Sequence, residues 1–256
     1  MTTLDFPLRK NNGDKISMVT CYDSSFASLI ESTEIDCILI GDSCAMVMHG
    51  QPTTLPADID MMVSHTKSVR NTTKKFIVSD MPFLTTRKGV EFATECAGKL
   101  LVAGANAVKI EGVDGQRDII DHLVQSGIPV MSHLGLTPQF FNAFGGHKRQ
   151  GKTEDSVEKI KREAKMAEEA GCFAIVLECI PPELAQEITE SVSIPTIGIG
   201  CSNTCDGQVL VLQDLLGMSN FTPKFVKKYL DGKTLITNAL NQYARDVKNG
   251  VSNESN

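Results

Sequence analysis

The sequence lacks the features that mark several common classes of protein. No apolar run approaches the roughly 20 residues that span a membrane. Acidic residues outnumber basic ones, which gives a formal net charge of -6 and a pI near 5.4. Nucleic-acid-binding proteins usually present a basic surface, and this charge balance argues against one. We therefore expect neither a nucleic-acid partner nor a membrane partner.

Zinc-site and secretory signals are also missing. None of the eight cysteines forms a CxxC pair, and no second pair of ligands follows Cys201 and Cys205. Residues 1–15 contain no apolar stretch of the kind found in secretory signals. We therefore expect reduced, mostly structural thiols in a cytoplasmic protein. Cys44, two residues after Asp42, is either a reactive nucleophile near a site or a bystander.

What the sequence does contain is an alternation of short apolar runs with segments of helical periodicity. A run of four or five apolar residues between turn residues is typical of a buried strand. Eight such runs occur, at 16–20, 37–41, 75–79, 107–110, 129–132, 174–177, 195–199 and 208–212. Eight strands joined by crossover helices imply a parallel sheet, and the chain length suits a closed (β/α)8 TIM barrel better than an open sheet.

Glycine recurs where a predicted helix meets the next strand. Gly104, Gly127 and Gly171 each occupy such a junction, and glycine suits the left-handed conformation that ends many helices. Thr153 is a candidate N-cap for the helix that follows it. No internal linker rich in Pro, Gly or Ser divides the chain, so we expect one barrel domain, residues 1–256. Its last dozen residues are polar, and we expect a short, frayed tail there.

Five ionisable side chains each lie at the end of one of these apolar runs. They are Asp42, Asp80, Glu111, His133 and Glu178. Because the carboxyl ends of barrel strands share one face, we expect all five at one mouth. Three converging carboxylates repel each other unless protons or a cation compensate. A divalent metal is the simplest compensation, and the pattern therefore predicts a metal-assisted enzyme.

Each of these residues also has a structural interpretation. Asp42 could cap a helix, and Asp80 could serve in the turn that precedes Met-Pro. Lys109 and Glu111 share one strand face, so Lys109 either forms a buried ion pair or binds an anion. His133 taken alone is consistent with a structural histidine.

Glu178 follows a wholly apolar run, and apolar surroundings favour the protonated form of a carboxylate. That property suits a general base near neutral pH, although Glu178 could also be a hydrogen-bonded residue of the mouth. Oxygen ligands without a Cys or His pair favour Mg²⁺ over Zn²⁺. A 2-oxo acid chelates such an ion through its carboxylate and keto oxygens, which stabilises an enolate. The residues alone thus predict metal-assisted enolate chemistry on a small anion.

One connection is unusually long. Residues 135–153 show no clear periodicity and carry three phenylalanines, two adjacent glycines and the basic run 147–149. A loop of this length inside a compact barrel is usually functional or mobile. It is either a lid or wall for an aromatic, anionic cosubstrate, or a subunit contact or solvated loop.

Longer motifs cover the chain from about residue 15 to about residue 232. They read TCYDSSFASLIESTEIDCILIGDSCAMVMHGQPTTLPADIDMMVSHTKSV, VSDMPF, AGANAVKIEG, GIPVMSHLGLTPQ, FAIVLECIP, SIPTIGIG, CDGQVLVLQDLLG and PKFVKKY. In this order they resemble the ketopantoate hydroxymethyltransferase family. The resemblance implies a (β/α)8 barrel of the phosphoenolpyruvate/pyruvate type. It also implies transfer of a one-carbon unit from 5,10-methylenetetrahydrofolate to 3-methyl-2-oxobutanoate, giving 2-dehydropantoate on the way to pantothenate.

The resemblance also implies a role for each matching residue. Asp42 and Asp80 correspond to Mg²⁺ ligands, with Glu111 as a further ligand or an acceptor beside them. Glu178 corresponds to the catalytic base. The residues that correspond to contacts with the 2-oxo acid are Asp42, Ser43, Asp80, Lys109 and His133. Members of the family form large homo-oligomers, often decamers.

Four positions depart from the family pattern. Cys201 and Ser202 replace small residues after the seventh strand, His49 stands where an aliphatic residue is common, and His147 stands where an aromatic one is usual. None of them removes a predicted ligand or base. We expect them to affect folate affinity and the shape of the pocket wall.

Two alternatives to a transferase remain. A metal-dependent carbon–carbon lyase or aldolase acting on a 2-oxo acid would use the same barrel and the same enolate. Such relatives usually carry a KKCGH-like motif, which this chain does not have. A catalytically silent barrel acting as a binding module is the other alternative, and the intact set of acids with Lys109 argues against it.

Overall fold

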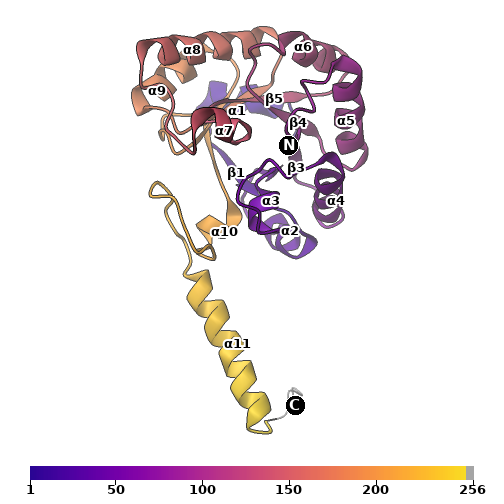
Figure 1. Ribbon diagram of the computed structural model, residues 1–256, viewed down its shortest axis with the longest axis vertical. Coiled ribbons are helices and arrows are strands. Elements are labelled where there is room, and N and C mark those ends of the chain that lie inside the picture. Colours follow the sequence, from indigo (N-terminus) through magenta and orange to yellow (C-terminus); the bar gives the residue numbers. More distant parts are fainter. Residues whose placement is uncertain (252–256) are drawn as a thin grey trace. The chain divides into compact units, whose positions relative to one another are not determined.

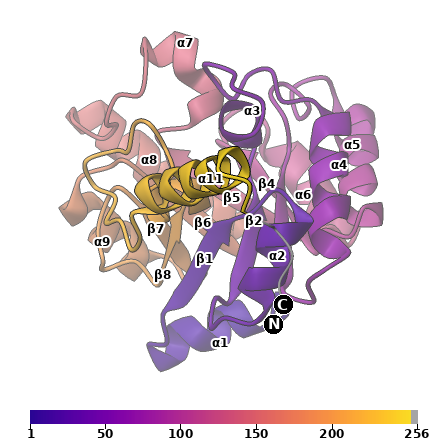
Figure 2. The same cartoon turned by 90° about the horizontal axis from the view of Figure 1, so that it is seen from below.

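Eight parallel strands close into a barrel, and their order around the ring follows their order in the sequence (Figures 1 and 2). The computed structural model describes residues 1–251. The chain divides into two compact units, residues 1–209, which hold the barrel as far as Val209, and residues 210–256. The strands are β1 (Ile16–Thr20), β2 (Cys37–Ile40), β3 (Phe76–Asp80), β4 (Ala107–Glu111), β5 (Val130–Gly135), β6 (Ala174–Glu178), β7 (Thr196–Ile199) and β8 (Gly207–Leu210). The predicted (β/α)8 barrel is confirmed, and the single-domain boundary stays a prediction.

Helices alternate with the strands and surround the barrel in the first unit (Figure 2). They are α1 (Asp5–Asn12), α2 (Ser24–Glu31), α3 (Cys44–Val47), α4 (Ile59–Arg70), α5 (Val90–Val102), α6 (Arg117–Gln125), the 3₁₀ turn η1 (Pro138–Phe140), α7 (Phe141–Phe144), α8 (Glu154–Glu169) and α9 (Pro182–Ser191). The second unit contains α10 (Leu212–Leu215) and α11 (Gly232–Lys248). Within residues 1–251, none of the helices has the length and apolar character needed to cross a bilayer.

Local signals in the sequence account for several helix ends. Thr153 caps α8, because its hydroxyl oxygen accepts the Ser156 N–H at 3.3 Å. Gly104, Gly127 and Gly171 take positive φ angles of 109°, 82° and 81°, as expected for residues that end a helix. These glycines turn the chain from a helix into the next strand.

The end of the chain differs from the predicted frayed tail. Helix α11 continues to Lys248, so residues 245–248 are helical. Apolar residues spaced three and four apart give α11 an amphipathic pattern that outweighs the polar residues near its end. They are Ile236, Leu240, Tyr243 and Val247. The last part of the predicted tail, residues 252–256, lies outside the described residues.

The base of the barrel, at the amino ends of the strands, is filled by an aromatic cluster. Phe6 of α1 packs edge-on against Phe76 and Phe173, with ring centroids 5.4 Å and 4.9 Å away. All three side chains belong to the main apolar core, which fills the inside of the barrel. Edge-to-face aromatic packing of this kind adds to the stabilisation from burial alone. Helix α1, which the sequence analysis did not predict, therefore plugs the base.

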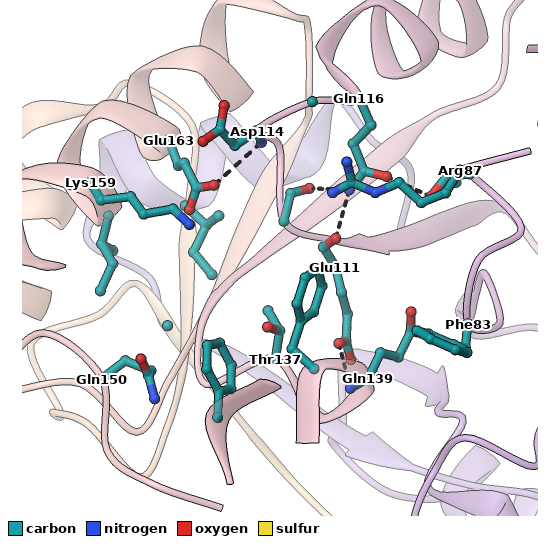
Figure 3. A pocket seen from close by; sticks show the side chains of 18 of the residues that line it. Phe83, Arg87, Glu111, Asp114, Gln116, Thr137, Gln139, Gln150, Lys159 and Glu163 are labelled. Carbon is teal, nitrogen blue, oxygen red and sulfur yellow. Dashed lines mark hydrogen bonds between the residues drawn. The ribbon is translucent and has the colours of Figure 1, made fainter. Parts of the chain in front are cut away.

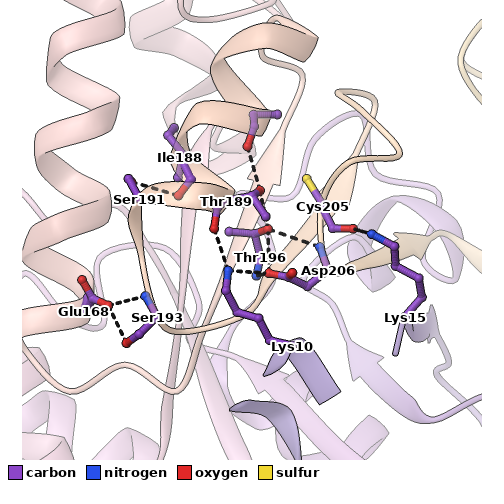
Figure 4. Close-up of polar contacts among 11 residues, drawn as sticks. Lys10, Lys15, Glu168, Ile188, Thr189, Ser191, Ser193, Thr196, Cys205 and Asp206 are labelled. Carbon is purple, nitrogen blue, oxygen red and sulfur yellow. Dashed lines mark hydrogen bonds and ion pairs between the residues drawn. The ribbon is translucent and has the colours of Figure 1, made fainter. Parts of the chain in front are cut away.

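A polar network joins the first and last strands at this base (Figure 4). The Ile16 N–H donates to the Asp206 carbonyl oxygen at 2.9 Å, immediately before β8. The Asp206 carboxylate accepts from the Thr196 N–H at 2.8 Å and pairs with Lys10 Nζ at 2.9 Å. Lys15 Nζ donates to the Cys205 carbonyl oxygen at 2.6 Å. The charges at the base are thus matched by partners, and together these contacts close the barrel.

Candidate active site

The structure brings the five predicted ionisable residues together at the carboxyl ends of β2 to β6. The parallel register sets Asp80 beside Lys109 and Glu111 beside His133. Glu178 ends β6, two strand positions after the residue paired with His133. Strand geometry therefore determines which side chains meet at the mouth.

Lys109 lies among the carboxylates. Its Nζ atom is 3.2 Å from Asp80 Oδ1 and 4.0 Å from Glu111 Oε1. It also lies 3.1 Å from His133 Nδ1. All four side chains are buried. The buried ion pair that was one interpretation of Lys109 is present, and an anion could still contact the same ammonium group.

His133 links Lys109 to Glu178. Because the Lys109 ammonium group has only protons to donate, His133 Nδ1 accepts and the imidazole proton is assigned to Nε2. His133 Nε2 lies 3.1 Å from Glu178 Oε2, but among the described residues it has no well-aligned hydrogen-bond acceptor. Burial and then the Lys109 charge lower the pKa of His133, which favours the neutral ring. Glu178 is the least buried of the predicted acids, with 16% of its side chain exposed.

Asp42 is held by contacts within the mouth. Its N–H donates to Asp80 Oδ2 at 3.0 Å, and its own Oδ2 accepts from Gln139 Nε2 at 2.8 Å. Helix α3 has Ser43 at its N-cap, without a side-chain capping bond. The helix-cap interpretation of Asp42 is therefore wrong.

Sequence reasoning missed two residues that organise this site. Gln139 binds both Asp42 and Glu111. Its side-chain amide donates to Asp42, and its backbone N–H donates to Glu111 Oε2 at 2.9 Å. Tyr22 is buried, and its hydroxyl lies 2.8 Å from Ser43 Oγ. Both occur inside the long family-like motifs, which was the signal that could have identified them.

The three carboxylates are only partly compensated. Burial raises the pKa of Asp42, and the charges of Asp80 and Glu111 raise it further. Burial also raises the pKa of Asp80 and takes that of Glu111 to about 7, although Lys109 lowers both. One buried cation therefore faces three acids that cannot all ionise easily without more positive charge.

The arrangement suits a hard divalent cation that brings ligands of its own. The described residues contain no group of three or more His, Cys, Asp or Glu side chains already spaced to hold a metal. However, among the described residues the buried Asp80 Oδ1 and Glu111 Oε1 have charge contacts with Lys109 but no well-formed hydrogen bond. The Asp42 N–H donates to Asp80, and the Asp42 carboxylate accepts from Gln139, which also binds Glu111. Mg²⁺ commonly takes one or two carboxylates and completes its shell with water and substrate oxygens. The carboxylate oxygens at the mouth suit this mode of coordination.

Cys44 is a bystander. Its thiol is buried and lies 3.7 Å from Met62 Sδ, and burial raises its pKa to about 12. A thiol so rarely ionised is a poor nucleophile. All eight cysteines are free in the structure.

A cavity of about 700 Å³ lies beside Glu111 (Figure 3). Its walls come from the loops that follow β3, β4 and β5 and from one face of α8. Residues that line it include Phe83, Arg87, Glu111, Gln139, Phe140, Phe144, Lys159 and Glu163. Because Glu111 and Gln139 belong both to this wall and to the carboxylate cluster, the cavity adjoins the mouth.

Comparison with known proteins gives consistent matches along the whole chain. The model of the ketopantoate hydroxymethyltransferase family matches residues 1–252. The 3-methyl-2-oxobutanoate hydroxymethyltransferase of Francisella tularensis subsp. novicida (strain U112) is 51% identical over 249 residues, which are 96% of this chain and 94% of the relative. The enzyme of the same name from Bdellovibrio bacteriovorus is 52% identical over 252 residues, 98% of this chain and 96% of the relative.

Solved structures share the fold at low identity. A 2,3-dimethylmalate lyase of the PEP mutase/isocitrate lyase superfamily superposes with a TM-score of 0.65 and 16% identity, covering 99% of this chain and 91% of that one. A phosphonopyruvate hydrolase in complex with oxalate and Mg²⁺ superposes with a TM-score of 0.65 and 12% identity, covering 98% and 88%. These neighbours share the (β/α)8 barrel fold.

Proposed function

The chain belongs to the ketopantoate hydroxymethyltransferase family, and from this premise we propose how its barrel mouth carries out the reaction. It is an enzyme, a hydroxymethyltransferase acting on 3-methyl-2-oxobutanoate. With 5,10-methylenetetrahydrofolate and water as co-reactants, the products are 2-dehydropantoate and tetrahydrofolate. The observation that best supports the mechanism is the buried group of three carboxylates around one lysine.

Asp42 and Asp80 are the proposed ligands of Mg²⁺, with Glu111 as a further ligand or an acceptor beside them. The raised pKa values of the three acids support this role, because a bound cation would offset their mutual repulsion. When bound, the ion would polarise the keto group of the oxo acid and acidify its neighbouring C–H bond.

Lys109 and Ser43 are the proposed contacts to the oxo acid. Lys109 is the buried cation of the mouth and suits the substrate carboxylate. Ser43 Oγ is positioned by the Tyr22 hydroxyl and adjoins Asp42 in the chain. His133, neutral and close to Lys109, offers a third polar contact on the same side as Glu178.

Glu178 is the proposed catalytic base. It is the one predicted acid that lies away from Lys109 and is partly open, so a substrate C–H bond can approach it. His133 Nε2 lies 3.1 Å from its carboxylate. Glu178 accepts the proton from C3 of the oxo acid, and C3 then bonds to the methylene carbon. That carbon exchanges its two bonds to the folate nitrogens for one bond to C3 and one to the oxygen of water, and the two nitrogens take up the protons to give tetrahydrofolate.

We also propose that the protein is a homo-oligomer in the cytoplasm, with a homodecamer as the expected form. Helix α11 leaves a stripe of large apolar side chains exposed, and stripes of this kind often mark interfaces. They are Leu235, Ile236, Leu240, Tyr243 and Val247. The eight free thiols are consistent with a reducing compartment. Light scattering coupled to size-exclusion chromatography would give the number of subunits.

A coupled assay tests the reaction. Purified protein is supplied with 3-methyl-2-oxobutanoate, 5,10-methylenetetrahydrofolate and Mg²⁺, and 2-dehydropantoate is followed with and without EDTA. We expect product that depends on folate and is lost with the chelator. Cleavage of a 2-oxo acid without folate would instead indicate a lyase, and Mg²⁺ binding without turnover would indicate a silent barrel.

A further inference from the structure

We propose that the cavity beside Glu111 seats the pterin ring of the folate cosubstrate, and that Glu163 recognises this ring. The inference rests on the proposed function, because the methylene carbon must reach the oxo acid at the mouth. The cavity meets that requirement, since Glu111 and Gln139 form part of its wall and also belong to the carboxylate cluster (Figure 3).

Glu163 occupies an unusual place for an acid. It lies on the buried face of α8, next to Ile160 and Ala164, and only 7% of it is exposed. Its Oε1 accepts the Asp114 N–H at 3.3 Å, and within residues 1–251 no lysine or arginine forms an ion pair with it. Burying this carboxylate is costly and raises its pKa, although the charge of nearby Lys159 offsets part of the rise. A ligand that donates hydrogen bonds to Glu163 from the cavity would offset that cost.

The pterin ring has the complementary chemistry. Its ring N–H and exocyclic amine are adjacent donors, and a carboxylate can accept both in parallel, as it does from a guanidinium group. Phe140 and Phe144 stack on each other, with centroids 6.0 Å apart and an interplanar angle of 29°, and both line the cavity. Their faces provide an apolar wall against which a flat heteroaromatic ring can pack. The 135–153 loop would then be a wall for the cosubstrate.

Two exposed cations lie on the same cavity. Arg87 and Lys159 line it and form no ion pair within the described part of the chain. The Arg87 guanidinium crosses the β4–α6 loop so closely that a Cβ on Gly115 would lie 2.8 Å from its Nη1. The Arg87 guanidinium suits an anionic group of the cosubstrate. Lys159 lies one turn from Glu163 on α8, and its charge lowers the pKa of that acid. The cavity therefore offers an acid and a flat apolar wall for the pterin ring, and a guanidinium group for an anionic part of the cosubstrate.

The test is direct binding of tetrahydrofolate to the full-length protein, without oxo acid, by calorimetry and by folate fluorescence. The chain contains no tryptophan, so the protein adds little background emission. Glu163→Gln keeps the size of the side chain but loses the charge that accepts two donors. We expect it to weaken tetrahydrofolate binding by roughly 10- to 100-fold, the range for hydrogen bonds to a charged group. The KM for 3-methyl-2-oxobutanoate should stay unchanged.

Glu158→Gln is the matched control, because Glu158 is an exposed acid on the same helix and does not line the cavity. Phe144→Leu is a second variant, and it should also weaken tetrahydrofolate binding. If the wild type binds and turns over folate while both cavity variants keep its affinity, the cavity assignment is overturned. If the wild type neither binds tetrahydrofolate nor makes product, the proposed function fails together with it.

Discussion

The two ends of the barrel treat charge in opposite ways. At the base, the Asp206 carboxylate accepts from Thr196 and pairs with Lys10. At the mouth, three buried acids share the charge of Lys109, and two of their oxygens have no well-formed hydrogen bond to any described residue. A matched charge stabilises the folded chain, whereas an unmatched group of charges is kept for a ligand that completes it. The comparison shows which charges of this fold serve its stability and which serve its chemistry.

The largest expected effect on activity comes from replacing the proposed catalytic base, Glu178. Glu178→Gln preserves the shape of the side chain but removes its ability to take a proton, and kcat should fall by about 10²–10⁴-fold. Steady-state kinetics measures the loss, and thermal unfolding should show no change in Tm. Glu183→Gln, an exposed acid in the first turn of α9, is the control. Turnover close to wild type would show that another group removes the proton.

The contrast between the ends can be tested with the same substitution at each. Asp206→Asn should lower the free energy of unfolding by about 1–3 kcal/mol, because a charged acceptor of several bonds is lost, and should leave kcat unchanged. Asp42→Asn should weaken Mg²⁺ binding without destabilising the metal-free protein, because it removes a repelled charge. Urea unfolding in EDTA and Mg²⁺ titration measure both. Equal destabilisation by the two variants would contradict the comparison.

A smaller effect is expected at Gly41, whose lack of a side chain leaves space for Ser43 Oγ. A Cβ on Gly41 would lie 2.7 Å from Ser43 Oγ, so Gly41→Ala should turn this hydroxyl away from Tyr22. We expect the KM for 3-methyl-2-oxobutanoate to rise about 10-fold, equivalent to about 1.4 kcal/mol. Gly98→Ala is the control, since nothing lies within 4 Å of its added methyl group. An unchanged KM in Gly41→Ala would remove Ser43 from the substrate contacts.

The smallest effect concerns the pH dependence of stability. Hydrogen bonds from the Thr73 hydroxyl and the Lys74 N–H lower the pKa of Glu31 from its ordinary 4.5, so its stabilisation is present above pH 4.5 and is lost as pH falls through the folded value. Burial raises the pKa of Glu163, so stability is lost as pH rises above 4.5. The difference in unfolding free energy between wild type and Glu31→Gln should therefore change with pH in the opposite direction to the difference between wild type and Glu163→Gln. Unfolding curves on either side of pH 4.5 measure both slopes. Slopes of the same sign would contradict these assignments.

Much of the fold and of the mouth could be predicted, because both depend on short apolar runs and on the residues that directly follow them in the sequence. The apolar runs predicted the ends of the strands to within three residues, and parallel pairing then requires polar residues that follow the strands to meet. Asp42, Asp80, Glu111, His133 and Glu178 all lie where that argument expects them. The local signal was weaker for α11, whose apolar spacing was obscured by the polar residues near its end.

Other contacts could not be predicted because they depend on loop paths. Gln139 reaches Asp42 across 97 residues, and nothing in its local sequence indicates which acid it will bind. Charged residues surround Glu163 in the sequence, which favours an exposed position, yet its side chain lies on the buried face of α8 beside the cavity. Such contacts are set when the loops after β4 and β5 pack together, which is a property of the folded chain.

The bond between Ile16 and Asp206 has a consequence for how the protein is made. Strand β1 emerges early from the ribosome, but β8, which closes the ring beside it, is the last strand to be synthesised. During that interval the growing sheet has an open edge, which is prone to pairing with other chains. Translation that stalls before Asp206 would release a barrel that cannot close, so nascent chains of this protein should depend on chaperones until the last strand arrives.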